Sequence, residues 1–389
     1  MLVVHLTHTP LAGAPIRICQ ALQLHPGIES RVCVLNAAAF GSRTFDEDLV
    51  WQRDKDEVID LVQRCDVLHL HNYIDLDSQE FAPIDFRRLW QQGKPMVRQF
   101  HAGPALVARF MGRSEAQVLD CPIPKLVCGQ WQERCYPNAR PVPLIVFPPE
   151  PAPRPSARDG VRISYAPSLF RPARAERWDT KGYPETRRML DQVQKRARAE
   201  GHAVTVDVIE MVPHQECLAR KALSHVAIDE LVTGSYHTST LESLAAGSAT
   251  MVYLDDRTRA SFMRLSGQYE LPVLSVPLEH AATMLGALVR DPELVDALGQ
   301  HSARWMREHW HPRDMVRHFL AAYEQVRADP HRPFETRFDG QGLEGWLSRG
   351  RYDLMWQSRS ALWPKEPPAW LLAGRGLAGR LLRSVGLRR

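Results

Sequence analysis

Short apolar runs alternate with amphipathic helical patterns along most of this chain, and the alternation starts again near its middle. Strands are expected at 2–6, 66–72 and 96–100 in the first half, where 66–72 ends in polar residues, and at 162–165 and 226–228 in the second. Apolar strands separated by helices are typical of parallel sheets that helices cover on both faces. The pattern therefore predicts an α/β fold with two Rossmann-like domains, in which ligands bind at the carboxyl ends of the strands.

The 148–155 segment, Pro-Pro-Glu-Pro-Ala-Pro-Arg-Pro, lies between the two halves. Proline removes a backbone donor and fixes φ, so this segment suits a stiff spacer better than a helix or a central strand. The last strand of the first half is expected just before it, at 143–147. The expected units are a first domain over 1–150, a second over 151–326, and a C-terminal extension over 327–389. We expect the final helices of the chain to cross back onto the first domain.

The stretch 225–256 predicts a strand, a short helix and a second strand in succession. Its first strand, 226–228, ends on Asp229 and Glu230, which places two carboxylates at a strand end, where sites are usually built. The second strand is expected at 251–254. The N-terminus of the helix between them has unpaired N–H groups and a partial positive charge, which favour a bound anion.

The helix of this stretch is expected to begin with a capping box, Ser239-Thr240-Leu241-Glu242, and to end at Gly247. Two interpretations of Glu242 stay open. In one, its carboxylate accepts a hydrogen bond from the Ser239 N–H and only completes the capping box. In the other, it binds the hydroxyl groups of a ribose whose diphosphate lies at the helix N-terminus, beside Ser239 and Thr240.

Four more candidate residues stand at predicted strand or helix ends. Gly13 follows the first strand and precedes a helix, so it either lets the backbone approach a phosphate or only makes a tight turn. Lys181 precedes a predicted helix at 184–200 and is either a phosphate ligand or a solvated surface lysine. His71 and His101 end two strands, where histidine serves as a general acid or base or is merely structural.

Composition limits the partners of the chain. A net charge of +4 over 389 residues does not indicate a nucleic-acid partner. Residues 1–6 lack the basic and apolar pattern of a targeting signal, and no apolar run reaches the length of a membrane span, which predicts a cytoplasmic protein. The seven cysteines fit a reducing compartment, and the spacing of Cys121, Cys128 and Cys135 is not that of metal ligands. We predict no metal site and no cofactor.

The end of the chain, 370–389, has five arginines and no acidic residue, interleaved with leucines. This composition is typical of a basic amphipathic segment that lies on an anionic membrane surface. Its glycines, at 374, 376, 379 and 386, disfavour a free helix, and a disordered tail or a packed helix is the alternative. The prediction for this segment is peripheral contact with the inner face of the cell membrane.

Taken together, these motifs resemble those of the family 4 retaining glycosyltransferases, which have the GT-B fold, over roughly residues 1–326. The segments that carry the resemblance are Ala12-Gly13-Ala14, Asp66-Val67-Leu68-His69-Leu70-His71-Asn72, Phe100-His101, Ala166-Pro167-Ser168 with Thr180-Lys181-Gly182, and Leu241-Glu242-Ser243-Leu244-Ala245-Ala246-Gly247. The resemblance implies that Gly13 and Lys181 contact the diphosphate of a nucleotide-sugar donor. It also implies that Glu242 holds the donor ribose and that His101 is an active-site residue.

One position departs from the pattern of that family. Its E-x7-E motif has a further glutamate eight positions before Glu242, and here that position is Gly234. Some members instead place an acidic residue at the end of the preceding strand. Asp229 and Glu230 are therefore the candidates for the catalytic carboxylate, together with His101 as a catalytic residue. The resemblance further implies catalysis without a metal ion.

The sequence thus predicts a retaining glycosyltransferase that moves a sugar from a nucleotide-diphosphate-sugar donor to a glycan or lipid-linked acceptor. The donor is expected on the second domain and the acceptor on the first, where His8 and His71 are the acceptor-side candidates. Two alternatives stay open. One is a nucleotide-sugar 2-epimerase with the same two-domain architecture, and the other is a non-catalytic partner subunit that lacks the glutamate at the position of Gly234.

Overall fold

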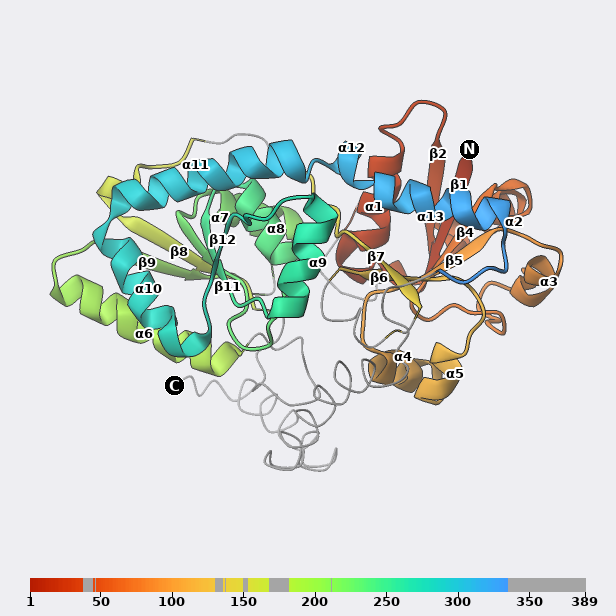
Figure 1. The fold of residues 1–389 in the computed structure, drawn as a ribbon, viewed down its shortest axis with the longest axis horizontal. Helices are drawn as coiled ribbons and strands as arrows, with labels where there is room; N and C mark the ends of the chain where they lie inside the picture. Colours follow the sequence, from red (N-terminus) through yellow and green to blue (C-terminus); the bar gives the residue numbers. More distant parts are fainter. Residues whose placement is uncertain are drawn as a thin grey trace, which may run out of the picture.

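The structure, a computed structural model, describes residues 1–37, 45, 47–129, 136, 138–149, 153–167, 182–210 and 212–334. In these ranges the chain forms two parallel sheets with helices packed on their faces (Figure 1). The structure therefore confirms the predicted α/β class and the GT-B arrangement of two Rossmann-like domains. Two of the predicted features, Lys181 and the 370–389 segment, lie outside the described residues.

The first sheet has the strand order β3-β2-β1-β4-β5-β6-β7, and all of its pairs are parallel. Its strands are β1 (Leu2–Thr7), β2 (Glu29–Val34), β3 (Leu49–Val50), β4 (Val67–His71), β5 (Met96–Phe100), β6 (Lys125–Cys128) and β7 (Ala139–Val142). Its helices are α1 (Ala14–Leu22), α2 (Trp51–Arg64), α3 (Phe86–Gln91), α4 (Pro104–Met111) and α5 (Glu115–Leu119). The central strands are buried along their whole length, which explains why most of their residues are apolar.

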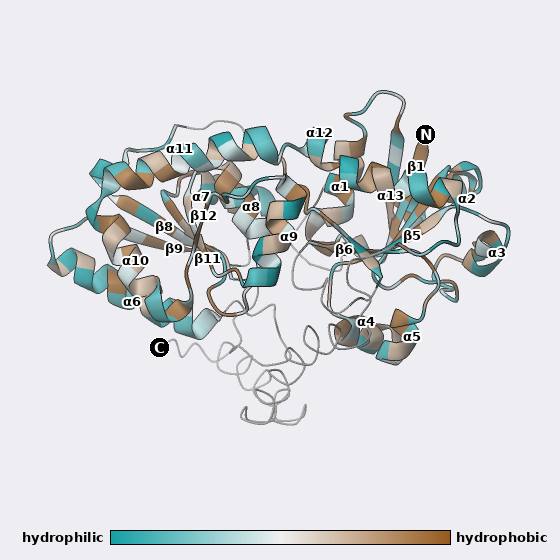
Figure 2. Cartoon of the chain, viewed as in Figure 1, coloured by the Kyte–Doolittle hydropathy of each residue, from teal (hydrophilic) through white to brown (hydrophobic). Residues whose placement is uncertain are grey.

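The second sheet has the order β12-β11-β10-β8-β9 and is also parallel. Its strands are β8 (Val161–Tyr165), β9 (Val204–Val208), β10 (Val226–Ile228), β11 (Ala249–Val252) and β12 (Val273–Ser275). The helices of this half are α6 (Tyr183–Ala199), α7 (His214–Ala222), α8 (Thr238–Ala245), α9 (Asp256–Ser266), α10 (Leu278–Arg290), α11 (Pro292–His309), α12 (Pro312–Met315) and α13 (Arg317–Ala328). The outer helices in Figure 2 mix teal and brown, as amphipathic helices do when only one side faces a sheet. None of the helices in the described ranges combines the length and the apolar character that a membrane span needs.

The prediction of a strand at 143–147 is wrong. The four residues of β6 pair with Ala139–Val142, so β7 ends there and no neighbouring strand remains for the residues that follow. The run is apolar for another reason, since Leu144, Ile145 and Val146 are buried in an apolar cluster shared by the two domains. Apolar content alone does not distinguish a strand from a buried connection.

That shared cluster joins residues of both domains around the connection. It includes Val3 and Ile18 from the first domain and Leu241 and Phe262 from the second. Trp310 lies in the same cluster and donates a hydrogen bond from Nε1 to the carbonyl of Leu144 at 3.0 Å. The contact area between the domains is therefore a packed apolar core, which fixes their relative position.

In each sheet the order in which the chain adds strands reverses at one point, and ligands of open parallel sheets bind at such points. In the first sheet the order reverses between β1 and β4, and in the second it reverses between β8 and β10. The loop with Gly13 follows β1, and Asp229 follows β10. The fold thus brings the predicted candidate residues to the two positions where a site is expected.

Helix α13, the last one in the described residues, crosses from the second half of the chain onto the first sheet (Figure 1), where it contacts β4, β5 and β7. Tyr323 and Phe319 of this helix are buried, and the Tyr323 hydroxyl lies 2.8 Å from His69 Nδ1. This hydrogen bond, and one from Arg140 of β7 to Gln325 Oε1 at 2.7 Å, supplement the apolar contacts of α13 with the sheet.

Replacing Tyr323 with phenylalanine is expected to lower the free energy of unfolding by about 1–2 kcal/mol, because the imidazole of His69 loses its buried partner. Urea denaturation followed by circular dichroism measures this change. Tyr269→Phe is the matched control, since Tyr269 is 82% exposed and its hydroxyl remains hydrated in either state. Equal denaturation midpoints for the two variants would show that the hydroxyl contributes nothing.

Candidate functional site

A cavity of about 250 Å³ lies between the two domains, where α1 faces α7 and α8. It is lined by Gly13, Ile16, Arg17, Gln20, Phe45, Val146, Phe147, His214, Gln215, Leu218 and Glu242. Two residues that the sequence singled out independently, Gly13 and Glu242, therefore line one cavity from opposite domains. This cavity has the mixed apolar and charged lining of a small-molecule site.

Gly13 caps the N-terminus of α1 with a φ of 78°. A Cβ atom at this position would lie 2.7 Å from the ring of Phe45, so the turn requires glycine for both its conformation and its space. Arg17 holds the same turn, because its NH2 group donates a hydrogen bond to the carbonyl of Ala12 at 2.6 Å. The turn that leads into α1 and the Arg17 guanidinium thus lie side by side at the cavity.

The buried carboxylate of Glu242 is shared by basic groups from three other positions in the chain. Its Oε2 accepts a hydrogen bond from Lys221 Nζ at 2.6 Å, and its Oε1 accepts one from His214 Nε2 at 2.9 Å. Arg17 NH1 reaches across the cavity to within 3.9 Å of Oε1. The interpretation of Glu242 as the partner of the Ser239 N–H is therefore wrong.

Electrostatics keep Glu242 and Lys221 charged. Burial by itself raises the pKa of Glu242, but Lys221, His214 and Arg17 outweigh this effect and hold that pKa well below its usual range. Burial by itself lowers the pKa of Lys221, but Glu242 raises it above its usual value. Burial lowers the pKa of Arg17, which stays charged near neutrality because guanidinium deprotonates only at high pH. The cations outnumber the one carboxylate, so the cavity favours an anionic ligand.

The N-cap of helix α8 is His237, two residues before the expected Ser239, and it forms no side-chain cap. Ser239 and Thr240 lie in its first turn, where Thr240 Oγ1 donates to Asp229 Oδ2 at 2.5 Å. The helix ends as predicted, since Gly247 follows it in the left-handed conformation with a φ of 77°.

Asp229, at the end of β10, holds the loop that leads into α8. Its Oδ2 accepts hydrogen bonds from the backbone N–H of His237 at 2.9 Å and from Thr240. His237 Nδ1 lies 3.1 Å from the same oxygen. The buried carboxylate thus positions the N-terminus of α8.

Glu230 is also buried and binds the same loop. Its Oε2 accepts from the N–H and the hydroxyl of Thr233 at 2.7 and 2.5 Å, and its Oε1 accepts from the N–H of Ser235 at 3.0 Å. Burial raises the pKa of Glu230 although these bonds oppose it. A catalytic role for Asp229 and Glu230 stays a prediction, and the observed contacts are those of residues that shape the loop.

Gly234, which stands where the resemblance places a glutamate, has a φ of 77°. A Cβ atom there would lie 2.9 Å from Cβ and 3.0 Å from Oδ2 of Asp255. A glutamate therefore does not fit this backbone. The adjacent carboxylate belongs to Asp255, which caps α9 by accepting from the N–H of Thr258.

Three predicted histidines lie on the first domain, and none of them lines the cavity. His71 Nδ1 is 3.0 Å from His101 Nε2, and the N–H of His101 donates to Asn72 Oδ1 at 2.7 Å. Burial lowers the pKa of His101 to about 3, so its imidazole is neutral. The remaining histidine, His8, lies 3.7 Å from Glu80, and burial lowers its pKa despite this carboxylate.

Sequence reasoning missed the three basic residues around Glu242. Arg17, His214 and Lys221 belong to no recognised motif, and two of them stand 28 and 21 residues from Glu242 along the chain. The one available signal was the amphipathic pattern of α7, which places Lys221 on the side that faces α8. Only the fold shows that this side is buried.

No protein-family model and no curated protein matches the chain. Among solved structures, it is similar to Anabaena HepE in complex with UDP and glucose (9% identity, 84% of this chain, 100% of that chain, TM-score 0.49). It is also similar to a Thermobaculum terrenum O-GlcNAc transferase mutant (14% identity, 85% of this chain, 68% of that chain, TM-score 0.47). A third similar structure is a Neisseria meningitidis UDP-GlcNAc 2-epimerase bound to UDP-GlcNAc (10% identity, 83% of this chain, 99% of that chain, TM-score 0.45). Likeness at this level does not decide between activities, so the site must be interpreted from its own residues.

Proposed function

We propose that this protein is a retaining glycosyltransferase, similar to family 4, that transfers a sugar from a nucleotide-diphosphate-sugar donor. The observation that supports the proposal most is the pairing of Gly13 and Arg17 with Glu242 across the interdomain cavity. A helix N-terminus with a guanidinium suits a diphosphate, and a carboxylate beside it suits the hydroxyl pair of a ribose.

The diphosphate would bind on the α1 side of the cavity. Arg17 Nε is buried and has no hydrogen-bond partner among the described residues, so it is available to an anionic ligand. The cation would also stabilise the negative charge that develops on the leaving diphosphate. Lys181, which lies outside the described residues, is proposed as a second cation for the same phosphates.

The ribose would bind to Glu242. An ionised carboxylate has about four lone-pair positions, and Lys221 and His214 occupy two of them. The remaining positions can accept two hydroxyl donors, while Lys221 fixes the side chain in place. We assign Ser239 and Thr240 to the donor side of the same site, in the first turn of α8.

The acceptor would bind to the first domain, on the side of His8, His71 and His101. We propose a glycan or a lipid-linked glycan as acceptor, with His101 next to the transferred sugar or the acceptor hydroxyl. The proposal includes peripheral contact of the 370–389 segment with an anionic membrane surface.

Nucleoside diphosphates are expected to raise the melting temperature of the protein, because a ligand that binds only the folded state stabilises it by about 2.7 kcal/mol at a concentration 100 times its Kd. A thermal-shift screen of UDP, GDP, ADP, CDP and TDP measures this. Arg17→Met should abolish the shift, whereas Arg64→Met, on the exposed side of α2, should leave it intact. A flat response to all five ligands would contradict the proposal and favour a non-catalytic subunit.

The reaction itself is tested by NMR of the matching nucleotide-sugar. Without acceptor, the spectrum of the nucleotide-sugar should stay unchanged, because a transferase needs an acceptor. A 2-epimerase, in contrast, would convert the nucleotide-sugar by itself. With acceptor, the anomeric configuration of the product should match that of the donor. Inverted configuration would overturn the retaining assignment but not the donor site.

A further inference from the structure

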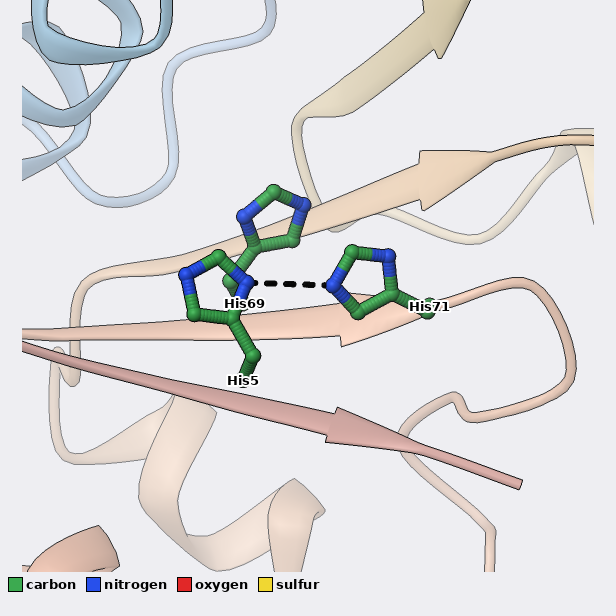
Figure 3. Close-up of side chains that lie close together, drawn as sticks. All are labelled: His5, His69 and His71. Atoms are coloured by element: carbon green, nitrogen blue, oxygen red, sulfur yellow. Dashed lines mark hydrogen bonds between the residues drawn. The ribbon is translucent and has the colours of Figure 1, made fainter. Parts of the chain in front are cut away.

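Three histidines gather on one face of the first sheet, away from the interdomain cavity. His5 lies on β1, and His69 and His71 lie two residues apart on β4 (Figure 3). His5 and His69 are register partners across the β1/β4 pair, so all three side chains project to the same side of the sheet. All three are 0% exposed, beneath α13.

The geometry of this cluster suits a single metal ion. One nitrogen from each ring lies within 4.8 Å of the other two. His5 Nδ1 and His71 Nε2 are 3.1 Å apart. Two nitrogens that bind the same tetrahedral ion at 2.0–2.1 Å are about 3.3 Å apart. One pair thus already has the required separation, and a rotation of the His69 ring brings in the third nitrogen.

Buried polar atoms around the cluster lack partners. His5 Nε2, His69 Nε2 and Gln99 Oε1 are buried and have no hydrogen bond of normal geometry among the described residues. Gln99 pairs with His71 across β4 and β5, so its side chain lies on the same face. Buried nitrogens and oxygens are rarely left in this state, and a bound cation would give His69 Nε2 and Gln99 Oε1 a partner.

Two of the three rings are also held in place by a hydrogen bond on their other nitrogen. The second nitrogen of His69 is held by the Tyr323 hydroxyl at 2.8 Å, and that of His71 by His101 at 3.0 Å. Metal-binding histidines usually have such a partner on their other nitrogen, which fixes the ring.

We propose that His5, His69 and His71 bind a divalent transition-metal ion, Zn²⁺ by preference, in a structural site beneath α13. Three neutral imidazoles and a nearby amide oxygen form a ligand set that suits Zn²⁺ and excludes Ca²⁺ and Mg²⁺, which prefer oxygen ligands. Because His69 also contacts Tyr323, the ion would link the first sheet to the helix that crosses back onto it. This proposal does not depend on the proposed glycosyl transfer.

The test uses the untagged full-length protein, so that no affinity tag contributes histidines. After removal of bound metal with a chelator, Co²⁺ is titrated and the visible absorption bands of four-coordinate Co²⁺ are recorded. We expect saturation at one Co²⁺ per chain, displacement by Zn²⁺, and a rise in melting temperature with either ion. A folded protein that shows no bands and no thermal shift would overturn the proposal and leave a cluster of hydrogen-bonded imidazoles.

Variants locate the binding. His5→Gln and His69→Gln should lose the Co²⁺ bands, whereas His301→Gln, on the exposed side of α11, should keep them. Tyr323→Phe leaves all three ligands in place and should weaken Co²⁺ binding by about tenfold, as the loss of an outer partner does. Bands that persist unchanged in folded His69→Gln protein would place the ion elsewhere and contradict the assignment. If a variant does not fold, the Co²⁺ titration of the wild-type protein still decides whether the chain binds a metal ion.

Discussion

Lys221→Met is expected to lower the free energy of unfolding by about 3–5 kcal/mol, because it leaves the Glu242 carboxylate buried without its nearest cation. Lys221 is 3% exposed and its ammonium lies 2.6 Å from Oε2, so water does not replace it readily. Arg17 and His214 remain near Oε1, which puts the expected loss at the lower end of this range. Urea denaturation monitored by tryptophan fluorescence measures the change.

Two further variants distinguish an uncompensated charge from a lost side chain. In the Lys221→Met, Glu242→Gln double variant neither buried charge remains, so most of the lost stability should return. Lys195→Met, on the exposed side of α6, should change stability by less than about 0.5 kcal/mol. If the double variant were as unstable as Lys221→Met, packing rather than charge would explain the loss.

The same pair predicts how stability depends on pH. The pKa of Glu242 is lower in the folded protein than its usual value of 4.5, so its contribution is complete above pH 4.5 and is lost as the pH falls through the folded pKa. The pKa of Lys221 is raised above 10.5, so its contribution is complete below pH 10.5 and is lost as the pH rises through the folded pKa. The Lys221→Met, Glu242→Gln double variant should lose the pH dependence of stability at both the acidic and the alkaline end. If its stability depended on pH as that of the wild type does, the proposed contribution of the ion pair would be wrong.

Burial on both faces of the sheet explains which strands the sequence analysis predicted correctly. The strands at 2–7, 67–71, 96–100 and 226–228 match their apolar runs to within one residue. A strand in the middle of a parallel sheet is buried on both faces, so nearly every position in it must be apolar. Such a pattern is visible in the sequence because each residue experiences the same environment.

The capping-box interpretation failed for the opposite reason. Ser239 and Glu242 have the right spacing, and local spacing is all that a sequence pattern measures. In the folded protein the carboxylate meets an ammonium and an imidazole from α7 and a guanidinium from α1. A carboxylate is attracted more strongly by a charged partner than by a neutral N–H, so partners from distant segments outcompete the local one.

The second large effect is expected for Glu242→Gln. It should weaken binding of the preferred nucleoside diphosphate by about 10- to 150-fold, since a hydrogen bond to a charged group contributes about 1.5–3 kcal/mol. An amide has one acceptor oxygen and cannot hold a pair of ribose hydroxyls as a carboxylate does. Isothermal titration calorimetry on the wild type and the variant measures the two Kd values.

Ligands without the hydroxyl pair show whether the loss comes from the ribose. The 2′,3′-dideoxy form of the same nucleotide should bind wild type and Glu242→Gln equally. Inorganic pyrophosphate should bind the variant at least as well, because a negative charge has been removed from the cavity. Arg17→Met should show the opposite pattern and weaken all three ligands, since its guanidinium faces the phosphates. If Glu242→Gln weakened the dideoxy nucleotide as much as the parent, the carboxylate would organise its basic neighbours rather than bind the sugar ring, and the ribose assignment would be wrong.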